Sequence, residues 1–155
     1  MTGLMKGKRG LIMGLANDKS LAWGIAKALH AHGAELAISY QGEVMEKRVK
    51  PLADQLGCDF LLDCDVSNMD NLDATIDFVV HAIGYTNKEA LRGAYADVGL
   101  EDFLMTMNIS VYSFTAVAKR AAAMMTPFDP ETGTGGGSLL TLSYYGAEKV
   151  IPHYN

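Results

Sequence analysis

RGLIMGLANDKSLAWGIAKALHAHGAELAISY, residues 9–40, contains the alternation that decides the fold. The stretch opens with an apolar run that ends at Gly14, continues through the turn-forming residues 15–19, and then spaces its apolar side chains as a helix does. Ser20 suits the N-cap of that helix and Gly33 suits its end. A second apolar run, residues 35–40, follows directly. The stretch therefore predicts a strand, a turn, a helix and a second strand.

The same alternation continues along the chain. Residues 42–57 have the pattern of a polar-faced helix, in which Pro51 predicts a kink or a break. Residues 100–125 can form one long, largely buried helix or two abutting ones, and residues 126–137 have the composition of a loop. Three further apolar runs are expected to be strands: residues 58–66, 76–84 and 137–143. Continuous apolar strands alternating with helices indicate a parallel α/β sheet covered on both faces. We expect residues 1–155 to form a single domain.

One connection is shorter than the pattern requires. Between the third and fourth predicted strands only residues 66–75 remain. A parallel crossover normally takes a dozen or more residues, usually with a helix. Either this crossover is unusually tight, or further residues belong after Thr75.

Bulk composition excludes several classes of protein. The 155 residues are 49% hydrophobic and 20% charged, which fits one globular domain. A net charge of −5 gives no electrostatic reason to expect nucleic acid. No apolar run is long enough to span a membrane, and the apolar run after the N-terminus is too short for a signal peptide, so we expect a cytoplasmic protein. Cys58 and Cys64 lack zinc-site spacing and are expected to be free thiols, and no other metal site is expected.

Small and polar residues follow the predicted strands. In an open parallel sheet, ligands bind beyond the carboxyl ends of the strands. Those ends carry Gly14, Tyr40–Gln41, Asp65–Val66, residues 82–84 and Ser143–Tyr144. Such a row of residues fits an extended nucleotide ligand.

The first turn is a candidate phosphate site. Gly14 permits a tight turn, Ala16 keeps the next position small, and Gly24 is expected to let the helix approach the sheet. The N–H groups near Ser20 and Leu21 would then face a pyrophosphate. The spacing is not that of a regular G-x-G-x-x-G motif, so an ordinary glycine turn is the alternative.

The end of the second strand bears on the choice of dinucleotide. An acidic residue usually binds the adenosine ribose there, but this chain has Gln41, whose amide can also hydrogen-bond ribose hydroxyls. No arginine stands at the turn to receive a 2′-phosphate. Lys47 and Arg48 lie further along and are expected to belong to a solvated helix face. The pattern favours NADH over NADPH.

Three segments together carry a resemblance to a known family: GLANDKSLAWGIAKALHAHGAELAISYQGE at 14–43, HAIG at 81–84 and SYYGAEKVIPHYN at 143–155. They are similar to the bacterial NADH-dependent enoyl-[acyl-carrier-protein] reductases, a divergent branch of the short-chain dehydrogenases/reductases. The resemblance implies a Rossmann-type, doubly wound parallel sheet in three layers. It also implies NADH-dependent reduction of the trans-2 double bond of enoyl-acyl-carrier-protein thioesters in fatty-acid elongation, and a homotetramer.

The resemblance also assigns roles to residues. It implies that Gly14, Ser20 and Leu21 contact the cofactor phosphates and that Gln41 contacts the adenosine side. It further implies that Asp65 and Val66 flank the adenine and that Gly84 lies near the ribose–nicotinamide half. Tyr144 and Tyr154 match the two active-site tyrosines of the family. The active-site lysine of the family would fall beyond Asn155, so we expect the protein to continue there.

The tyrosines have distinct expected roles. Hydride delivery to the β-carbon of an enoyl thioester moves charge onto the carbonyl oxygen, and a hydroxyl aimed at that oxygen would stabilise the enolate. Tyr154 is the candidate donor, Tyr144 would line the pocket, and Tyr145 is expected to be a packing residue.

Other polar and sulfur-containing residues are expected to be structural. His81 is expected to be a hydrogen-bonded core histidine and Asn108 an ordinary helix-interior residue. The methionines at 105, 107, 124 and 125 are expected to fill the core or a subunit interface. Two other functions remain open: an ordinary short-chain dehydrogenase acting on an alcohol or ketone, and a non-catalytic nucleotide-binding domain.

Overall fold

The computed structural model describes residues 3–64 and 75–151, and its centre is a parallel five-stranded sheet. The strands are β1 (Arg9–Met13), β2 (Glu35–Tyr40), β3 (Phe60–Asp63), β4 (Phe78–His81) and β5 (Ser138–Thr141). Their order across the sheet is β3-β2-β1-β4-β5. This order reverses between β1 and β4, as in the doubly wound Rossmann fold. The predicted α/β class and parallel sheet are confirmed.

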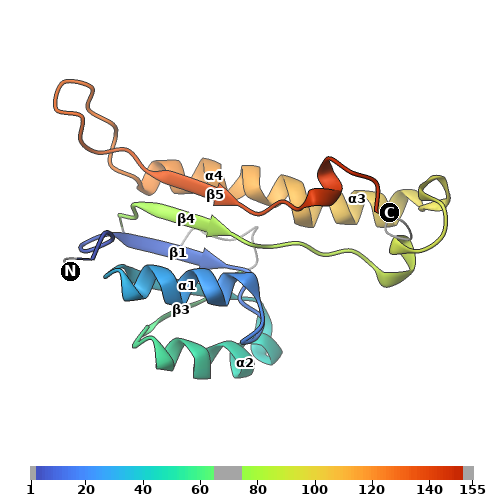
Figure 1. Cartoon of the computed structure of the whole chain (residues 1–155), viewed down its shortest axis with the longest axis horizontal. Helices are drawn as coiled ribbons and strands as arrows, with labels where there is room; N and C mark the ends of the chain where they lie inside the picture. The colour runs from blue at the N-terminus through green and yellow to red at the C-terminus, as the bar shows by residue number, and fades with distance from the viewer. Residues whose placement is uncertain (1–2, 65–74, 152–155) are drawn as a thin grey trace.

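Within the described residues, α-helices cover the two faces of the sheet (Figure 1). Helices α1 (Leu21–Ala31) and α2 (Gly42–Gln55) lie on one side and α4 (Ser113–Met124) lies on the other, whereas α3 (Leu100–Met107) lies in line with α4, beyond the ends of the strands. Short helical turns are η1 (Lys88–Leu91), η2 (Tyr95–Asp97), the π turn η3 (Asn108–Tyr112) and η4 (Tyr145–Ala147). Because η3 joins α3 to α4 without a break, the segment is one continuous helix with a π turn inside it.

The central strands β1 and β4 bury both of their faces, because side chains alternate along a strand and point to opposite sides of the sheet. On β1, Ile12 packs with α1 and α2, whereas Leu11 and Met13 pack with Val117 and Ala121 of α4. Phe78 of β4 lies over the paired residue Gly10, where a Cβ would approach the ring to 2.0 Å. The sheet therefore separates two apolar clusters, which makes three layers.

Two expectations about the helices are wrong. Pro51 lies inside α2 without ending it, because Val49, Leu52 and Ala53 are buried against the sheet and hold the helix together. Gly24 does not bring α1 close to the sheet, since a Cβ there would meet nothing within 4 Å. The residues of α1 that approach the sheet are instead small and buried: Ala22 and Ala26.

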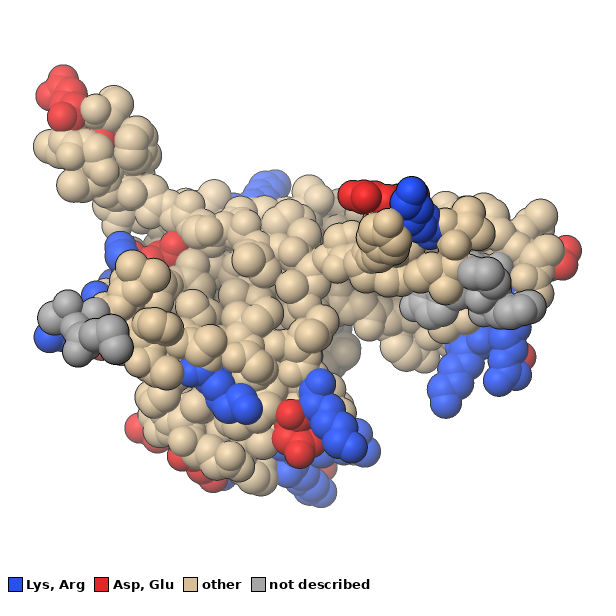
Figure 2. All heavy atoms as spheres, viewed as in Figure 1, with Lys and Arg blue, Asp and Glu red and all other residues tan. Residues whose placement is uncertain are grey.

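The exposed face of α2 carries charges of both signs. Lys47 and Arg48 are exposed, and so is Glu43 in the first turn of the helix. Figure 2 shows basic and acidic side chains side by side on the visible part of the molecule where α2 lies. The helix therefore has the solvated, mixed-charge face that the sequence predicts.

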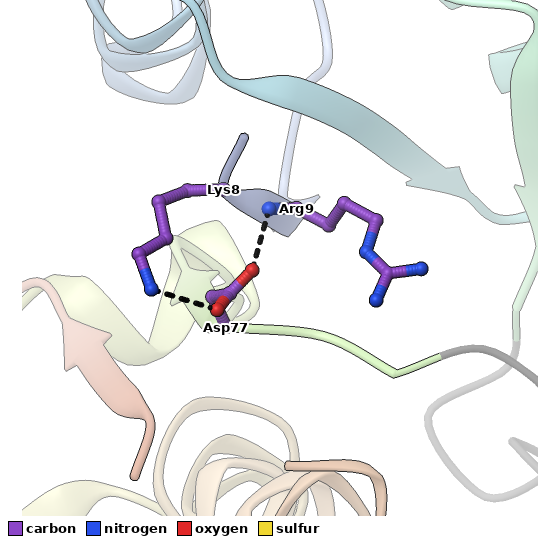
Figure 3. A network of polar contacts seen from close by, with 3 residues as sticks. All are labelled: Lys8, Arg9 and Asp77. Atoms are coloured by element: carbon purple, nitrogen blue, oxygen red, sulfur yellow. Dashed lines mark hydrogen bonds and ion pairs between the residues drawn. The ribbon is translucent and has the colours of Figure 1, made fainter. Parts of the chain in front are cut away.

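Asp77 fastens three strands at their amino ends (Figure 3). Its Oδ1 accepts a hydrogen bond from Lys8 Nζ at 3.0 Å, and its Oδ2 accepts one from the Arg9 N–H at 2.8 Å. Its backbone carbonyl accepts from the N–H of Ser138 at 2.9 Å. Partial burial alone would raise the pKa of Asp77, but the Arg9 N–H and the Lys8 ammonium outweigh it and hold the pKa below its ordinary value.

Candidate functional site

A cleft of about 460 Å³ opens at the carboxyl ends of the strands. It lies where the strand order reverses, between the end of β1 and the end of β4. Three of the predicted cofactor residues line it: Gly14, Gln41 and Gly84. Its other lining residues come from the same strand ends, from α2 and from the helix that begins at α3: Leu15, Ala16, Ser39, Tyr40, Met45, Cys64, Ala82, Ile83, Tyr85, Asn108, Ile109, Tyr112, Ser113 and Ala116. Ligands of doubly wound sheets bind at this position.

Gly14 shapes the cleft through a backbone contact. Its φ is +87°, a conformation that L side chains rarely adopt. A Cβ at this position would lie 2.1 Å from the carbonyl oxygen of Ala82, at the end of the neighbouring strand. The glycine is therefore required by the close approach of β1 and β4, in addition to the space for a pyrophosphate that the sequence predicts.

Ser20 and Leu21 lie outside this cleft. They line a second hollow, together with Trp23, Lys27 and Leu142. Ser20 is the N-cap of α1, but its Oγ donates to the carbonyl of Asn17 at 2.6 Å instead of capping the helix. No acidic residue stands in the first turn of α1, and the charges of Asp18 and Lys19, which line the same hollow, are of opposite sign. That leaves the helix start suited to an anion, and the phosphate role of Ser20 and Leu21 remains a prediction.

Gln41 is held at the turn between β2 and α2. It is the N-cap residue of α2 in extended backbone conformation, and its side chain makes no capping hydrogen bond. The next residue, Gly42, donates its N–H to Oδ1 of Asp63 at 2.9 Å. Gln41 lines the cleft, and its contact with the adenosine side of a cofactor remains a prediction.

Gly84 leads into a segment that is fastened to the long helix. The N–H of Tyr85 donates to Ser110 Oγ at 3.1 Å, and that hydroxyl donates to the Tyr85 carbonyl at 3.2 Å. Further along, Thr86 and Thr106 share a hydrogen bond of 2.7 Å. These bonds fix one wall of the cleft against the π turn, a feature that is often found at functional sites.

His81 is a buried, hydrogen-bonded histidine, as predicted. Its Nε2 lies 2.8 Å from Ser113 Oγ, and its Nδ1 lies 3.4 Å from Thr141 Oγ1. Because Ser113 donates its proton to the Ile109 carbonyl at 2.5 Å, it must accept from Nε2–H, and Nδ1 then accepts from Thr141. Burial lowers the pKa of His81, which favours this neutral form. The chain of hydrogen bonds joins β4, β5 and α4 beneath the cleft.

Of the tyrosines near the end of the chain, Tyr144 and Tyr145 lie among the described residues, and neither of them lines the cleft. Tyr144 is 53% exposed and does not line the cleft, and its ring lies against Gly146. Tyr145 is 64% exposed and begins η4, so the expectation that it packs is wrong. The reason is that β5 ends at Thr141, before strand alternation reaches position 145. Tyr154 lies outside the described residues, as do Asp65 and Val66.

Several lining residues were not assigned to the cleft from the sequence. Asn108 lies inside the continuous helix, as expected, yet it is exposed and lines the cleft at the first position of the π turn. Cys64 and Tyr85 also line it, directly after a strand or close to one. The sequence could have identified them by their positions: Cys64 and Tyr85 follow strand ends, and Asn108 is a polar residue inside an apolar helix. Cys58 is a buried free thiol, and burial raises its pKa.

Comparison with known proteins decides the family. The model of the enoyl-(acyl carrier protein) reductase family matches residues 14–155. The chain belongs to this family. A curated enoyl-[acyl-carrier-protein] reductase [NADH] 2 of Rhizobium meliloti is 53% identical over the whole chain, which spans 59% of that relative. A curated enoyl-[acyl-carrier-protein] reductase [NADH] of Aquifex aeolicus is 42% identical over 99% of the chain, which spans 58% of it.

Solved structures of enoyl-(acyl carrier protein) reductases have the same fold. The Anaplasma phagocytophilum enzyme, in complex with NAD, matches with a TM-score of 0.88 at 50% identity over the whole chain and 60% of that structure. The Bacillus cereus enzyme, solved with NADP⁺ and indole naphthyridinone, matches with a TM-score of 0.86 at 40% identity over 98% of the chain and 61% of that structure. The chain thus spans about 60% of the family members it matches. The expected Rossmann-type fold is confirmed.

Metal-binding groups and membrane-spanning helices are both absent from the part of the chain that the structure describes. Across residues 3–64 and 75–151, no group of three or more His, Cys, Asp or Glu side chains is placed to hold a metal ion. Within the same residues, no helix is both long and apolar enough to cross a membrane.

Proposed function

We propose that the protein containing this chain uses NADH to reduce the trans-2 double bond of enoyl-acyl-carrier-protein thioesters in fatty-acid elongation. The observation that carries the proposal is the cleft at the reversal of strand order, lined by Gly14, Gln41 and Gly84 in a member of this reductase family. The open glycine turn, the amide at the end of β2 and the acid-free start of α1 fit a dinucleotide. NADH supplies the hydride when it is bound.

In the proposed reaction the chain stabilises charge on the substrate. Reduction at the β-carbon places negative charge on the thioester carbonyl oxygen, and the hydroxyl of Tyr154 donates a hydrogen bond to it. A tyrosine has an ordinary pKa of ~10, so its hydroxyl is protonated at neutral pH. Tyr144 lines the acyl pocket beside the thioester. Asp65 and Val66 flank the adenine, and Ser20 and Leu21 contact the phosphates.

Exposed apolar side chains support a homotetramer as part of the proposal. Along α3 and the π turn, Leu100, Leu104 and Val111 are each more than half exposed. An apolar face of this kind is typical of a subunit interface. The methionines at 105 and 107 lie in the same helix. A cytoplasmic location also belongs to the proposal.

The test is NADH oxidation with a trans-2-enoyl thioester, compared with a ketone. Tyr154→Phe should lower kcat by about 10²-fold while NADH affinity is kept, because one charge-stabilising donor is lost and the ring stays. Tyr144→Phe should instead mainly raise KM for the thioester. Tyr145→Phe is the matched control and should leave both constants unchanged.

Three results would contradict these assignments. Ketone reduction without thioester reduction would favour an ordinary short-chain dehydrogenase, and NADH binding without any turnover would favour a nucleotide-binding domain. Full kcat in the Tyr154→Phe variant would move the donor role to another group.

A further inference from the structure

The turn between β2 and α2 lacks the charge that usually selects NADH. In Rossmann domains an acidic residue at the end of the second strand binds the ribose 2′-hydroxyl and disfavours a 2′-phosphate. Gln41 stands at that place and is neutral. Selection against NADPH must therefore come from another residue, or be absent.

Asp63 supplies a carboxylate at this turn from the neighbouring strand. It is the last residue of β3 and pairs with Tyr40 in the parallel register. Its Oδ1 accepts the N–H of Gly42 at 2.9 Å, so the carboxylate lies at the start of α2, one residue from Gln41. Burial, the charge of Glu46 and then the charge of Asp63 raise the pKa of Tyr40. The field of Asp63 therefore reaches the end of β2, which lines the cleft.

A 2′-phosphate at this turn would be opposed in two ways. The N–H groups at a helix start are natural ligands for phosphate oxygens, and Asp63 already occupies the one at Gly42. The carboxylate also repels a second anion. Glu43 in the first turn of α2 adds charge of the same sign. Lys47 and Arg48 are exposed one to two turns further along the helix, among acidic neighbours.

We propose that Asp63 is the specificity-determining residue that makes the cleft select NADH over NADPH. The inference rests on the proposed function and adds which side chain sets the cofactor preference. Both dinucleotides occur within the family, since the curated relatives are named as NADH enzymes and the Bacillus cereus structure contains NADP⁺.

The test is a fluorescence titration of the protein with NADH and with NADPH, giving two dissociation constants for each variant. Asp63→Asn keeps an oxygen that can accept from Gly42 and removes only the charge, whereas Asp63→Ala removes both. Asp54→Asn is the matched control for net charge, because Asp54 lies at the far end of α2 from Gly42. Thermal melts of all variants report whether the fold is kept.

Wild type should bind NADH more tightly than NADPH. Asp63→Asn should narrow the ratio of the two dissociation constants about five- to tenfold, mainly by tightening NADPH binding, because a charge that repels the 2′-phosphate is removed. Asp63→Ala should narrow it further, because the Gly42 N–H is then free. In 1 M salt the wild-type affinities for NADH and NADPH should become more similar, because salt screens the repulsion between Asp63 and the 2′-phosphate. Asp54→Asn should leave the ratio unchanged.

Three outcomes would overturn the proposal: equal wild-type affinity for both cofactors, an unchanged ratio in Asp63→Asn, or a parallel loss of both affinities. The last would show that Asp63 only holds the turn in shape. A wild-type protein that binds neither cofactor would refute the proposed function, and this inference with it.

Discussion

Replacing Gly14 by alanine tests how the cleft is built. The added Cβ would lie 2.1 Å from the carbonyl oxygen of Ala82 and 3.1 Å from the N–H nitrogen of Ile83. Both atoms are backbone, so no side chain can turn aside to make room. The ends of β1 and β4 must separate, or the turn must leave its φ of +87°.

The expected cost has two parts. A left-handed conformation costs an alanine about 1–2 kcal/mol relative to glycine. Forcing an extra carbon into a packed contact adds about 1–3 kcal/mol. Gly14→Ala should therefore lose about 2–5 kcal/mol of unfolding free energy, out of the 5–15 kcal/mol typical of a domain. Gly93→Ala is the control, since its φ is +83° but a Cβ there meets nothing within 4 Å, and it should lose only about 1–2 kcal/mol.

Urea unfolding of the three proteins, followed by far-UV circular dichroism, measures these values. NADH titration of the folded variants should show weaker binding for Gly14→Ala than for Gly93→Ala, because the displaced strand ends form the cleft. Gly14→Val should block NADH binding more completely. Equal stability losses in the two alanine variants would refute the packing argument, and normal NADH affinity in Gly14→Val would remove Gly14 from the phosphate turn.

Two further predictions concern buried and partly buried ionisable groups. Because burial lowers the pKa of His81, the unfolded chain binds its proton first, and unfolding free energy should fall as the pH drops below about 6.5. Urea titrations from pH 7.5 to 5 should show this slope. His81→Phe should reduce the slope and lose about 1–3 kcal/mol of unfolding free energy at pH 7.5, because the buried hydrogen bonds of His81 to Ser113 and Thr141 are removed. Asp77 has a lowered pKa, so its stabilising contribution should be present above its ordinary pKa of about 4 and be lost as the pH falls through the folded value. Asp77→Asn should cost about 1 kcal/mol at pH 7 and little at pH 3, and a pH-independent cost would contradict the role of the Lys8 contact.

The fold was predictable because its signal is local. The run ELAISY became β2 over the same residues, Glu35–Tyr40, and Ser20 became the N-cap of α1. The failures arose where tertiary packing outweighs local preference. Pro51 remains inside α2 because three buried neighbours hold that helix on the sheet. The close approach of α1 to the sheet was predicted at Gly24, but Ala22 and Ala26 are the residues buried there.

The cleft was only partly predictable. Strand ends identified Gly14, Gln41 and Gly84, since parallel strands deliver their carboxyl ends to one edge. Sequence spacing could not show that Ser20 and Leu21 face a different hollow, because that depends on how the chain turns between β1 and α1. It also could not show that Asp63 reaches across to Gly42, a contact between residues 21 positions apart.

The walls of the cleft are held in place by backbone packing and by buried hydrogen bonds beneath it. Gly14 has no side chain to bind anything, and its effect comes from the backbone of Ala82 pressing against it. Beneath the cleft, His81 links β4 to Thr141 of β5 and, through Ser113, to the carbonyl of Ile109 in the π turn, next to Asn108 in the cleft wall. Thr141 lies three residues before Tyr144 on the chain. A substitution that breaks the hydrogen bonds of His81 should therefore shift the cleft wall at Asn108 relative to Tyr144. It should lower the rate of the proposed reaction although His81 itself does not line the cleft.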